Sequence, residues 1–128
     1  MPITYHVIQR GEPGVVGGGT QQYYAAAVSQ GEATIDDLTH SIEKRTTMSG
    51  ADIRGVLYAL TEVIPEELAD GNIVRLGDLG NFRVSISSEG HQLEEDVTPE
   101  SITDARILFD PDEKFEVMLR NLEYVEGT

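Results

Sequence analysis

A glycine-rich turn constrains this chain more than any other feature of its sequence. The turn Gly77-Asp78-Leu79-Gly80 separates two apolar segments, residues 73–76 and residues 81–86. Glycine adopts positive φ angles at little steric cost, so two glycines this close together favour a tight reversal of the backbone. The second segment alternates apolar and polar residues, which is the period of a strand with one buried face. These features predict an antiparallel β-hairpin.

Two segments ahead of the hairpin have the apolar spacing of amphipathic helices. In the first, Thr34 is a typical N-cap residue, and apolar residues follow at helical spacing over residues 35–42. In the second, Ser49 is the N-cap residue, and a longer apolar stripe runs over residues 53–68. Pro65 lies inside this stripe and removes one backbone hydrogen bond, so we expect a kink there.

The segment that follows the hairpin is expected to leave the body of the protein and return to it. Residues 85–104 are largely polar, and Pro99 disfavours a regular central strand there. Apolar residues alternate again over residues 105–109. A last short helix is expected to start with Asp110 as its cap and Pro111 at its first position, where proline is favoured. The pattern predicts a protruding arm followed by a C-terminal helix.

The first thirty residues predict a second β-hairpin. Residues 3–7 alternate apolar and polar side chains, and residues 22–28 form another strand-like run. Residues 11–20, which join them, contain five glycines and one proline. We therefore divide the chain into a β-hairpin extension packed on the body at 1–32, a main domain at 33–122 and a loose tail at 123–128.

The apolar stripes outnumber the surfaces that one chain offers to cover them. Two helices and one sheet each present a single apolar face, and each face must be buried against another element. One chain of 128 residues does not supply enough partners for all of these faces. The sequence therefore predicts a homodimer.

The charge of the chain limits its partners. Nine Lys and Arg residues stand against 23 Asp and Glu residues, which gives a net charge of -14. Proteins that bind nucleic acid ordinarily present a basic surface to the phosphates, so any basic patch here must be assembled by folding. The chain has no cysteine, and no apolar stretch approaches the roughly 20 residues that span a bilayer. We expect a cytoplasmic protein without a membrane partner.

The sequence gives little support for a catalytic site or a metal site. His6, His40 and His91 are far apart in the sequence and lack the spacing of a metal-binding pair. Glu94 and Glu95 could act as acid and base only beside an apolar pocket that raises one pKa, and their neighbours are polar. The sequence therefore predicts no enzyme, no metal and no cofactor.

The order of these elements resembles the HU/IHF family of bacterial histone-like DNA-binding proteins. The motif Leu76-Gly77-x-x-Gly80-x-Phe82 and the sequence Phe109-Asp110-Pro111 carry the resemblance, which covers residues 33–122. The added N-terminal segment is similar to a longer HU-like subgroup. The predicted structural residues of the turn region are Gly77, Gly80, Phe82, Phe109 and Pro111.

The resemblance implies an α+β fold and a DNA-binding function. The fold would have two N-terminal helices, a β-hairpin with a protruding arm and a short C-terminal helix, preceded here by the β-hairpin extension. Members of the family form intertwined homodimers in which paired sheets make a saddle for DNA and two arms reach around the duplex. The resemblance thus implies a nucleoid-associated protein that condenses DNA.

The residues that touch DNA in the family are largely replaced here. The arm has no Lys or Arg between Arg83 and Arg106, and the usual Arg-Asn-Pro tip is absent. Ser85 and Ser87 stand where the family tends to have arginines, and Asp110 and Glu113 stand at two positions that are usually lysine. The candidate DNA-binding residues that remain are Arg75, Arg83 and Arg106.

Two functions are consistent with these residues. In the first, the three arginines of each protomer share one face of a dimer and bind duplex DNA weakly and without sequence specificity. Releasing about six counterions would give a log–log salt slope on the order of -5. The arginines could instead neutralise nearby carboxylates in surface pairs worth about 0 to 1 kcal/mol each. In the second function, the acidic arm binds a basic protein partner and the chain does not bind DNA.

Overall fold

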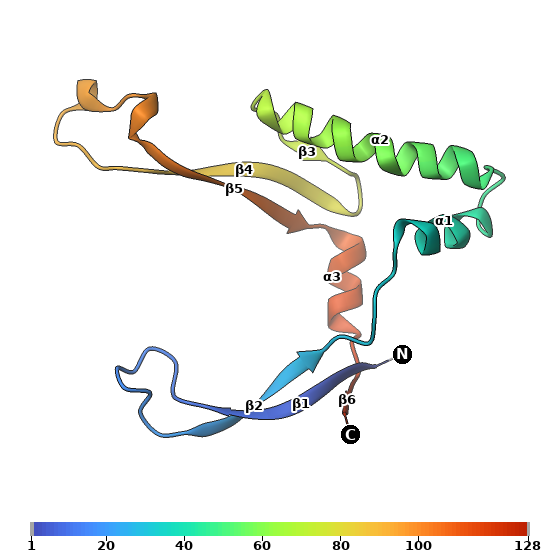
Figure 1. Ribbon diagram of the computed structural model, residues 1–128, viewed down its shortest axis with the longest axis horizontal. Helices are drawn as coiled ribbons and strands as arrows, with labels where there is room; N and C mark the ends of the chain where they lie inside the picture. The colour runs from blue at the N-terminus through green and yellow to red at the C-terminus, as the bar shows by residue number, and fades with distance from the viewer. Residues whose placement is uncertain (1, 128) are drawn as a thin grey trace. The chain divides into compact units, whose positions relative to one another are not determined.

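The chain folds into two compact units. The computed structural model describes residues 2–127, and Figure 1 shows them as a ribbon. One unit comprises Met1–Thr34 and Leu119–Thr128, and the other comprises Ile35–Met118. Helices and strands both contribute, so the fold belongs to the α+β class.

The first unit is built on a three-stranded sheet. Strands β1 (Ile3–Arg10) and β2 (Gln22–Val28) are antiparallel and pair without interruption from Thr4 opposite Val28 to Arg10 opposite Gln22. Both strands lie where alternation and β-branched or aromatic residues predict them. The loop between them contains three consecutive glycines with positive φ, from Gly17 to Gly19, a backbone conformation that few other residues adopt.

The C-terminal residues form a third strand in place of the loose tail expected from the sequence. Strand β6 (Tyr124–Glu126) pairs in parallel with β1 and completes the order β2-β1-β6. The Ile3 amide donates to the Glu123 carbonyl at 2.7 Å, and the Gly127 amide donates to the Tyr5 carbonyl at 2.8 Å. Three residues are too few to show a strand period, and their partner strand lies at the other end of the sequence.

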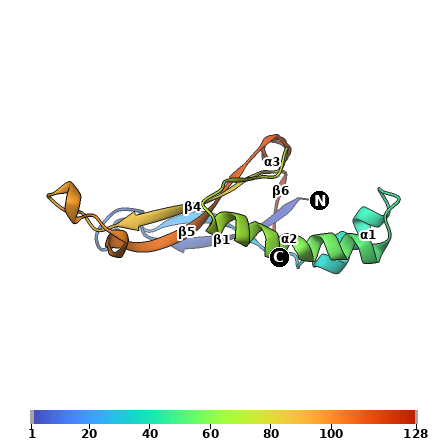
Figure 2. The ribbon, with the colours of Figure 1, turned by 90° about the horizontal axis from the view of Figure 1, so that it is seen from above.

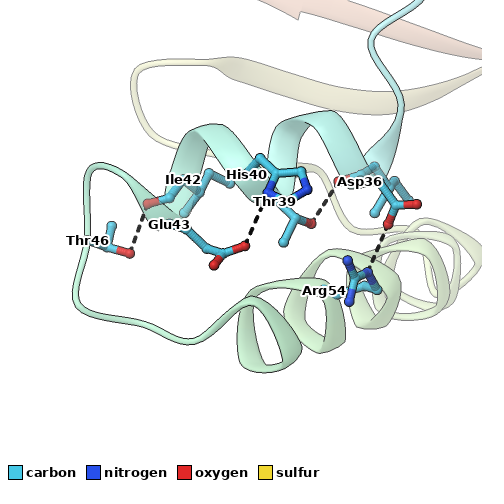
Figure 3. Close-up of polar contacts among 8 residues, drawn as sticks. Asp36, Thr39, His40, Ile42, Glu43, Thr46 and Arg54 are labelled. Atoms are coloured by element: carbon cyan, nitrogen blue, oxygen red, sulfur yellow. Dashed lines mark hydrogen bonds and ion pairs between the residues drawn. The ribbon is translucent and has the colours of Figure 1, made fainter.

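The second unit begins with two helices, α1 (Ile35–Glu43) and α2 (Gly50–Ala69). The Ser49 hydroxyl accepts a hydrogen bond from the Asp52 amide at 3.2 Å, so Ser49 is the N-cap that the sequence predicts. Arg54 of α2 donates to Asp36 of α1 at 3.0 Å and ties the two helices together (Figure 3). Helix α2 continues through Pro65 to Ala69.

The second sheet confirms the predicted hairpin. Its strands are β3 (Val74–Arg75), β4 (Gly80–Ser88) and β5 (Ile102–Pro111), in the order β3-β4-β5. The Leu76 amide donates to the Gly80 carbonyl at 2.9 Å and closes the turn. The φ angles of +58° at Gly77 and +145° at Gly80 explain why glycine occupies both positions.

An arm extends from strands β4 and β5, and Figures 1 and 2 both show its tip beyond their ends. The strands stay paired as far as Ser88 opposite Ile102, with one register shift at the end of the ladder. The tip contains two short 3₁₀ turns, Glu94–Asp96 and Pro99–Ser101. Ser101 is buried, and its hydroxyl lies 2.9 Å from a ring nitrogen of His91. The tip therefore has an ordered local structure of its own.

The last helix, α3 (Glu113–Arg120), starts later than the sequence predicts. Asp112 caps it: the Asp112 carboxylate accepts from the Glu113 amide at 2.8 Å, and its carbonyl accepts from the Glu116 amide at 3.0 Å. The prediction that Asp110 is the cap and Pro111 the first helical residue is wrong. Both residues belong to β5, where Pro111 lies opposite Gly80.

Candidate nucleic-acid interface

The strand register gathers the three candidate arginines on one face of the β3-β4-β5 sheet. Arg75 lies next to β4 opposite Asn81, and Arg106 lies opposite Ser85. Opposite residues on antiparallel strands project to the same face, as do alternate residues along one strand. Asn81, Arg83 and Ser85 alternate along β4, so all three arginines share a face. We define the arginine face by Arg75, Asn81, Arg83, Ser85, Ser87, Asp104, Arg106, Leu108 and Asp110.

The opposite face of this sheet is apolar and lies toward α2. Its residues alternate with those of the arginine face. Phe82, Val84 and Ile107 from this face line a groove of about 510 Å³ together with α2 residues such as Ile64 and Leu68. Helix α2 therefore sits on the apolar side of the sheet. The arginine face is the other side, and all three of its arginines are exposed to solvent.

The charges of the arginine face nearly balance, but they are not all paired. Arg83 donates to the Asp110 carboxylate at 2.9 Å, across the β4–β5 ladder. Arg75 and Arg106 make no ion pair with any residue in the described range 2–127. One arginine of the three thus neutralises a carboxylate, and two retain a free charge.

Asn81, Ser85 and Ser87 add neutral hydrogen-bonding groups to the same face. Ser85 and Ser87 on β4 are half-buried. Asn81 lies between Arg75 of β3 and Asp110 of β5 in the ladder, and sequence reasoning did not single it out. Its only signal in the sequence is that it is two residues before Arg83 in an alternating strand. These side chains can donate to phosphate oxygens beside the arginines.

The predicted structural residues of the turn meet at one end of the sheet. Gly80 lies opposite Pro111, and Phe82 lies opposite Phe109. The rings of Phe82 and Phe109 are tilted, with centroids 4.9 Å apart, and Phe115 of α3 packs edge-on to Phe109 at 5.8 Å. Gly77 lies in the open turn itself, with no atoms near the position of a Cβ.

A family model covers nearly the whole chain. The model is HU-HIG, described as an HU domain fused to wHTH, Ig, or glycine-rich motif, and it matches residues 1–126. The chain belongs to the HU-HIG family. No curated protein matches it.

A solved structure resembles the fold of this HU-HIG chain. It is the crystal structure of a protein from Bacteroides vulgatus ATCC 8482, described as a candidate bacterial DNA-binding protein, and the TM-score is 0.63 at 8% sequence identity. The match covers 98% of the HU-HIG chain and 49% of the other chain, so the HU-HIG chain spans about half the length of that protein. At this identity the likeness concerns the fold alone.

The arm tip of the HU-HIG chain differs in charge from the arginine face. Between Arg83 and Arg106 every charged side chain is acidic. The side chains of Leu93 and Val97 on the tip are both 55% exposed. The acidic residues of the arm are Glu89, Glu94, Glu95, Asp96, Glu100 and Asp104.

Groups of metal-ligating side chains and membrane-spanning helices were both sought among residues 2–127. Among residues 2–127, no three His, Asp or Glu side chains are placed to hold a metal ion. Within the same residues, no helix has the length and apolar character needed to cross a bilayer.

Proposed function

We propose that this HU-HIG chain is a dimeric architectural protein that binds duplex DNA weakly and without sequence specificity through its arginine face. The observation that carries the proposal is the register that brings Arg75, Arg83 and Arg106 onto one exposed face. Membership of the HU-HIG family and the fold shared with the Bacteroides vulgatus protein support it. Such a protein would act in the bacterial nucleoid, and no step of this function needs catalysis.

The chemistry of the face suits phosphates better than base edges. Guanidinium groups bind phosphate oxygens in a bidentate geometry, and hydroxyl and amide groups beside them add weaker donors. Contacts of this kind position a protein on the duplex but do not read its sequence. The proposed binding is therefore nonspecific.

The free arginines set how strongly binding should depend on salt. Arg75 and Arg106 of two protomers provide four unpaired cations, while Arg83 is held by Asp110. Four phosphate contacts correspond to a log–log salt slope of roughly -3.6, and six would give roughly -5.4. Titrating a fluorescent duplex of about 30 base pairs at several salt concentrations tests the proposal. No binding at 50 mM salt with about 100 μM protein would contradict it, given typical nonspecific constants.

Freeing the third arginine should strengthen DNA binding. Asp110→Asn removes the carboxylate that holds Arg83 and leaves a neutral side chain of the same shape. We expect tighter binding at 50 mM salt and a slope steeper by roughly two per dimer, because two more cations reach phosphates. A matched control is Asp36→Asn, which frees Arg54 on the helices. An equal gain in DNA affinity from both variants would show a general effect of net charge and would contradict a role for the arginine face.

We propose a dimer because the apolar face of the β3-β4-β5 sheet is poorly covered within the second unit. Val84 is 42% exposed and Ile107 is 60% exposed, although both line the groove against α2. Full burial of such a side chain stabilises a protein by roughly 1.5–3 kcal/mol. A second copy that fills the groove would supply this burial for both protomers.

Sedimentation equilibrium tests the dimer. At micromolar concentration we expect a mass of at least two chains and no folded species with the mass of one chain. Ile107→Glu places a charge in the groove, and we expect it to lower the dimer fraction and the unfolding midpoint together. A folded wild-type monomer at micromolar concentration would overturn the dimer.

The acidic arm favours a second candidate function. Its tip carries only negative charge, which suits a basic protein partner and opposes phosphates. Titration with a purified basic HU protein tests this function. Binding of the HU protein that weakens with added salt and survives substitution of Arg106 would support this second function. No binding of the HU protein at low salt would count against it.

A further inference from the structure

Strand β2 is an unprotected sheet edge. It is the outer strand in the order β2-β1-β6, so the backbone groups on its far side have no partner within that sheet. Proteins usually blunt such edges with charges, prolines or bulges. The β2 sequence Gln-Tyr-Tyr-Ala-Ala-Ala-Val contains no charge and no proline, and its ladder to β1 shows no register shift. Seven residues are therefore available for further strand pairing.

One face of this sheet has a hollow that is lined by residues of all three strands, β2 included. The hollow has a volume of about 330 Å³, and its lining is almost entirely apolar. Tyr23 lies on the same face as Ala25 and Ala27, because alternate residues of a strand share a face. Its side chain is 71% exposed. The residues that line the hollow are Ile3, Tyr5, Ala25, Ala27 and Tyr124.

We infer that β2 pairs with β2 of a second copy, antiparallel and centred on Ala25. This register is the one that matches the full length of the strand with itself, so Gln22 lies opposite Val28 of the second copy. Tyr23 of the second copy then lies opposite Ala27 on the same face. The Cβ atoms of such pairs are about 5 Å apart, so the exposed tyrosine ring of the second copy would lie over Ala27, on the β2 side of the hollow. Each tyrosine of β2 thus meets an alanine of the other copy, in both protomers.

The charges of the first unit permit this pairing. Residues 1–34 and 119–128 contain two basic and four acidic residues, so this unit carries only a small part of the net charge of -14. None of its charged residues lies within β2. Like charges directly opposite each other destabilise a strand pair, and this register opposes none. A second copy therefore fits the edge without repulsion across it.

The absence of native cysteine makes a direct test possible. In Ala25→Cys the two introduced thiols would face each other, with Cα atoms about 4.5–5.5 Å apart, which a disulfide can bridge. The matched control is Gln22→Cys on the same exposed strand, whose two thiols would be roughly 20 Å apart. Under mild oxidation we expect Ala25→Cys to cross-link at least tenfold faster. Equal cross-linking rates for the two variants would overturn the inference that β2 pairs with β2 of a second copy.

A pair of variants tests the register and also guards against misfolding of Ala25→Cys. Gln22→Cys and Val28→Cys chains, when co-expressed, should cross-link to each other, whereas neither should cross-link to itself. A co-expressed pair that cross-links no more than the separate chains would contradict the register. Neither test depends on DNA, so its failure would leave the proposed function of the arginine face untouched.

Discussion

Reversing both unpaired arginines, Arg75→Glu with Arg106→Glu, is expected to abolish detectable binding to duplex DNA at 50 mM salt. The change removes four cations from the dimer and replaces them with four anions on the surface proposed to meet the phosphates. Nonspecific dissociation constants are typically about 10⁻⁴–10⁻⁶ M, so a loss of affinity of about a thousandfold or more moves the dissociation constant to about 10⁻³ M or above, beyond the protein concentration of the titration. Fluorescence anisotropy with a labelled duplex measures the effect.

The control for this reversal carries the same change in net charge. Arg45→Glu with Arg54→Glu alters two arginines of the helical region, and Arg54 there pairs with Asp36 at 3.0 Å. We expect this control to bind DNA at most a few times more weakly than the wild type, through long-range repulsion. Equal losses of DNA affinity in the two double variants would show that the net charge of the protein governs binding and that the arginine face does not.

Replacing Gly80 with alanine is expected to cause the largest loss of stability in the hairpin. The φ angle of Gly80 is +145°, where an L side chain is strained. A Cβ at this position would collide with the Asp110 carbonyl oxygen and lie 2.8 Å from the Phe109 ring. Because backbone and a packed aromatic ring cannot easily move away, we expect a loss of about 3 kcal/mol or more. Urea unfolding at one fixed protein concentration measures it.

Gly77→Ala is the matched control in the same turn. Gly77 has a φ angle of +58°, but a Cβ there would meet no atom within 4 Å. Only the left-handed backbone conformation is penalised, at about 1–2 kcal/mol. If Gly80→Ala proved no more harmful than Gly77→Ala, the close approach of β4 and β5 at this turn would be contradicted.

Local periodicity predicted most of the elements correctly. The spacing of apolar residues and the Ser49 cap lie within one element each, so the bounds of α2 and of β2 could be inferred from their own sequence. Strand β6 could not, because three residues carry no period and pair with the other end of the chain. The start of α3 was misplaced because Asp110 and Asp112 are equally good caps in the sequence, and pairing of Pro111 with Gly80 decides between them.

The candidate site depends on register, which the sequence alone does not give. Arg75, Arg83 and Arg106 lie on three strands that a turn and an arm separate. A slip of one residue in either pairing would move an arginine to the opposite face of the sheet. The sequence could therefore name the three arginines but could not decide whether they share a face. The ion pair of Arg83 with Asp110 could not be predicted for the same reason, since it joins residues 27 positions apart on two different strands.

The most direct test of the DNA-binding account is a footprint of duplex DNA on the protein by nuclear magnetic resonance. An isotope-labelled dimer would be titrated with a short duplex at 50 mM salt, and the amide and arginine side-chain signals would be followed. The expected result is that perturbed signals cluster on the arginine face, with Arg75 and Arg106 among the largest. Perturbations confined to the acidic arm tip at residues 89–101, or none at all with excess duplex, would contradict the account.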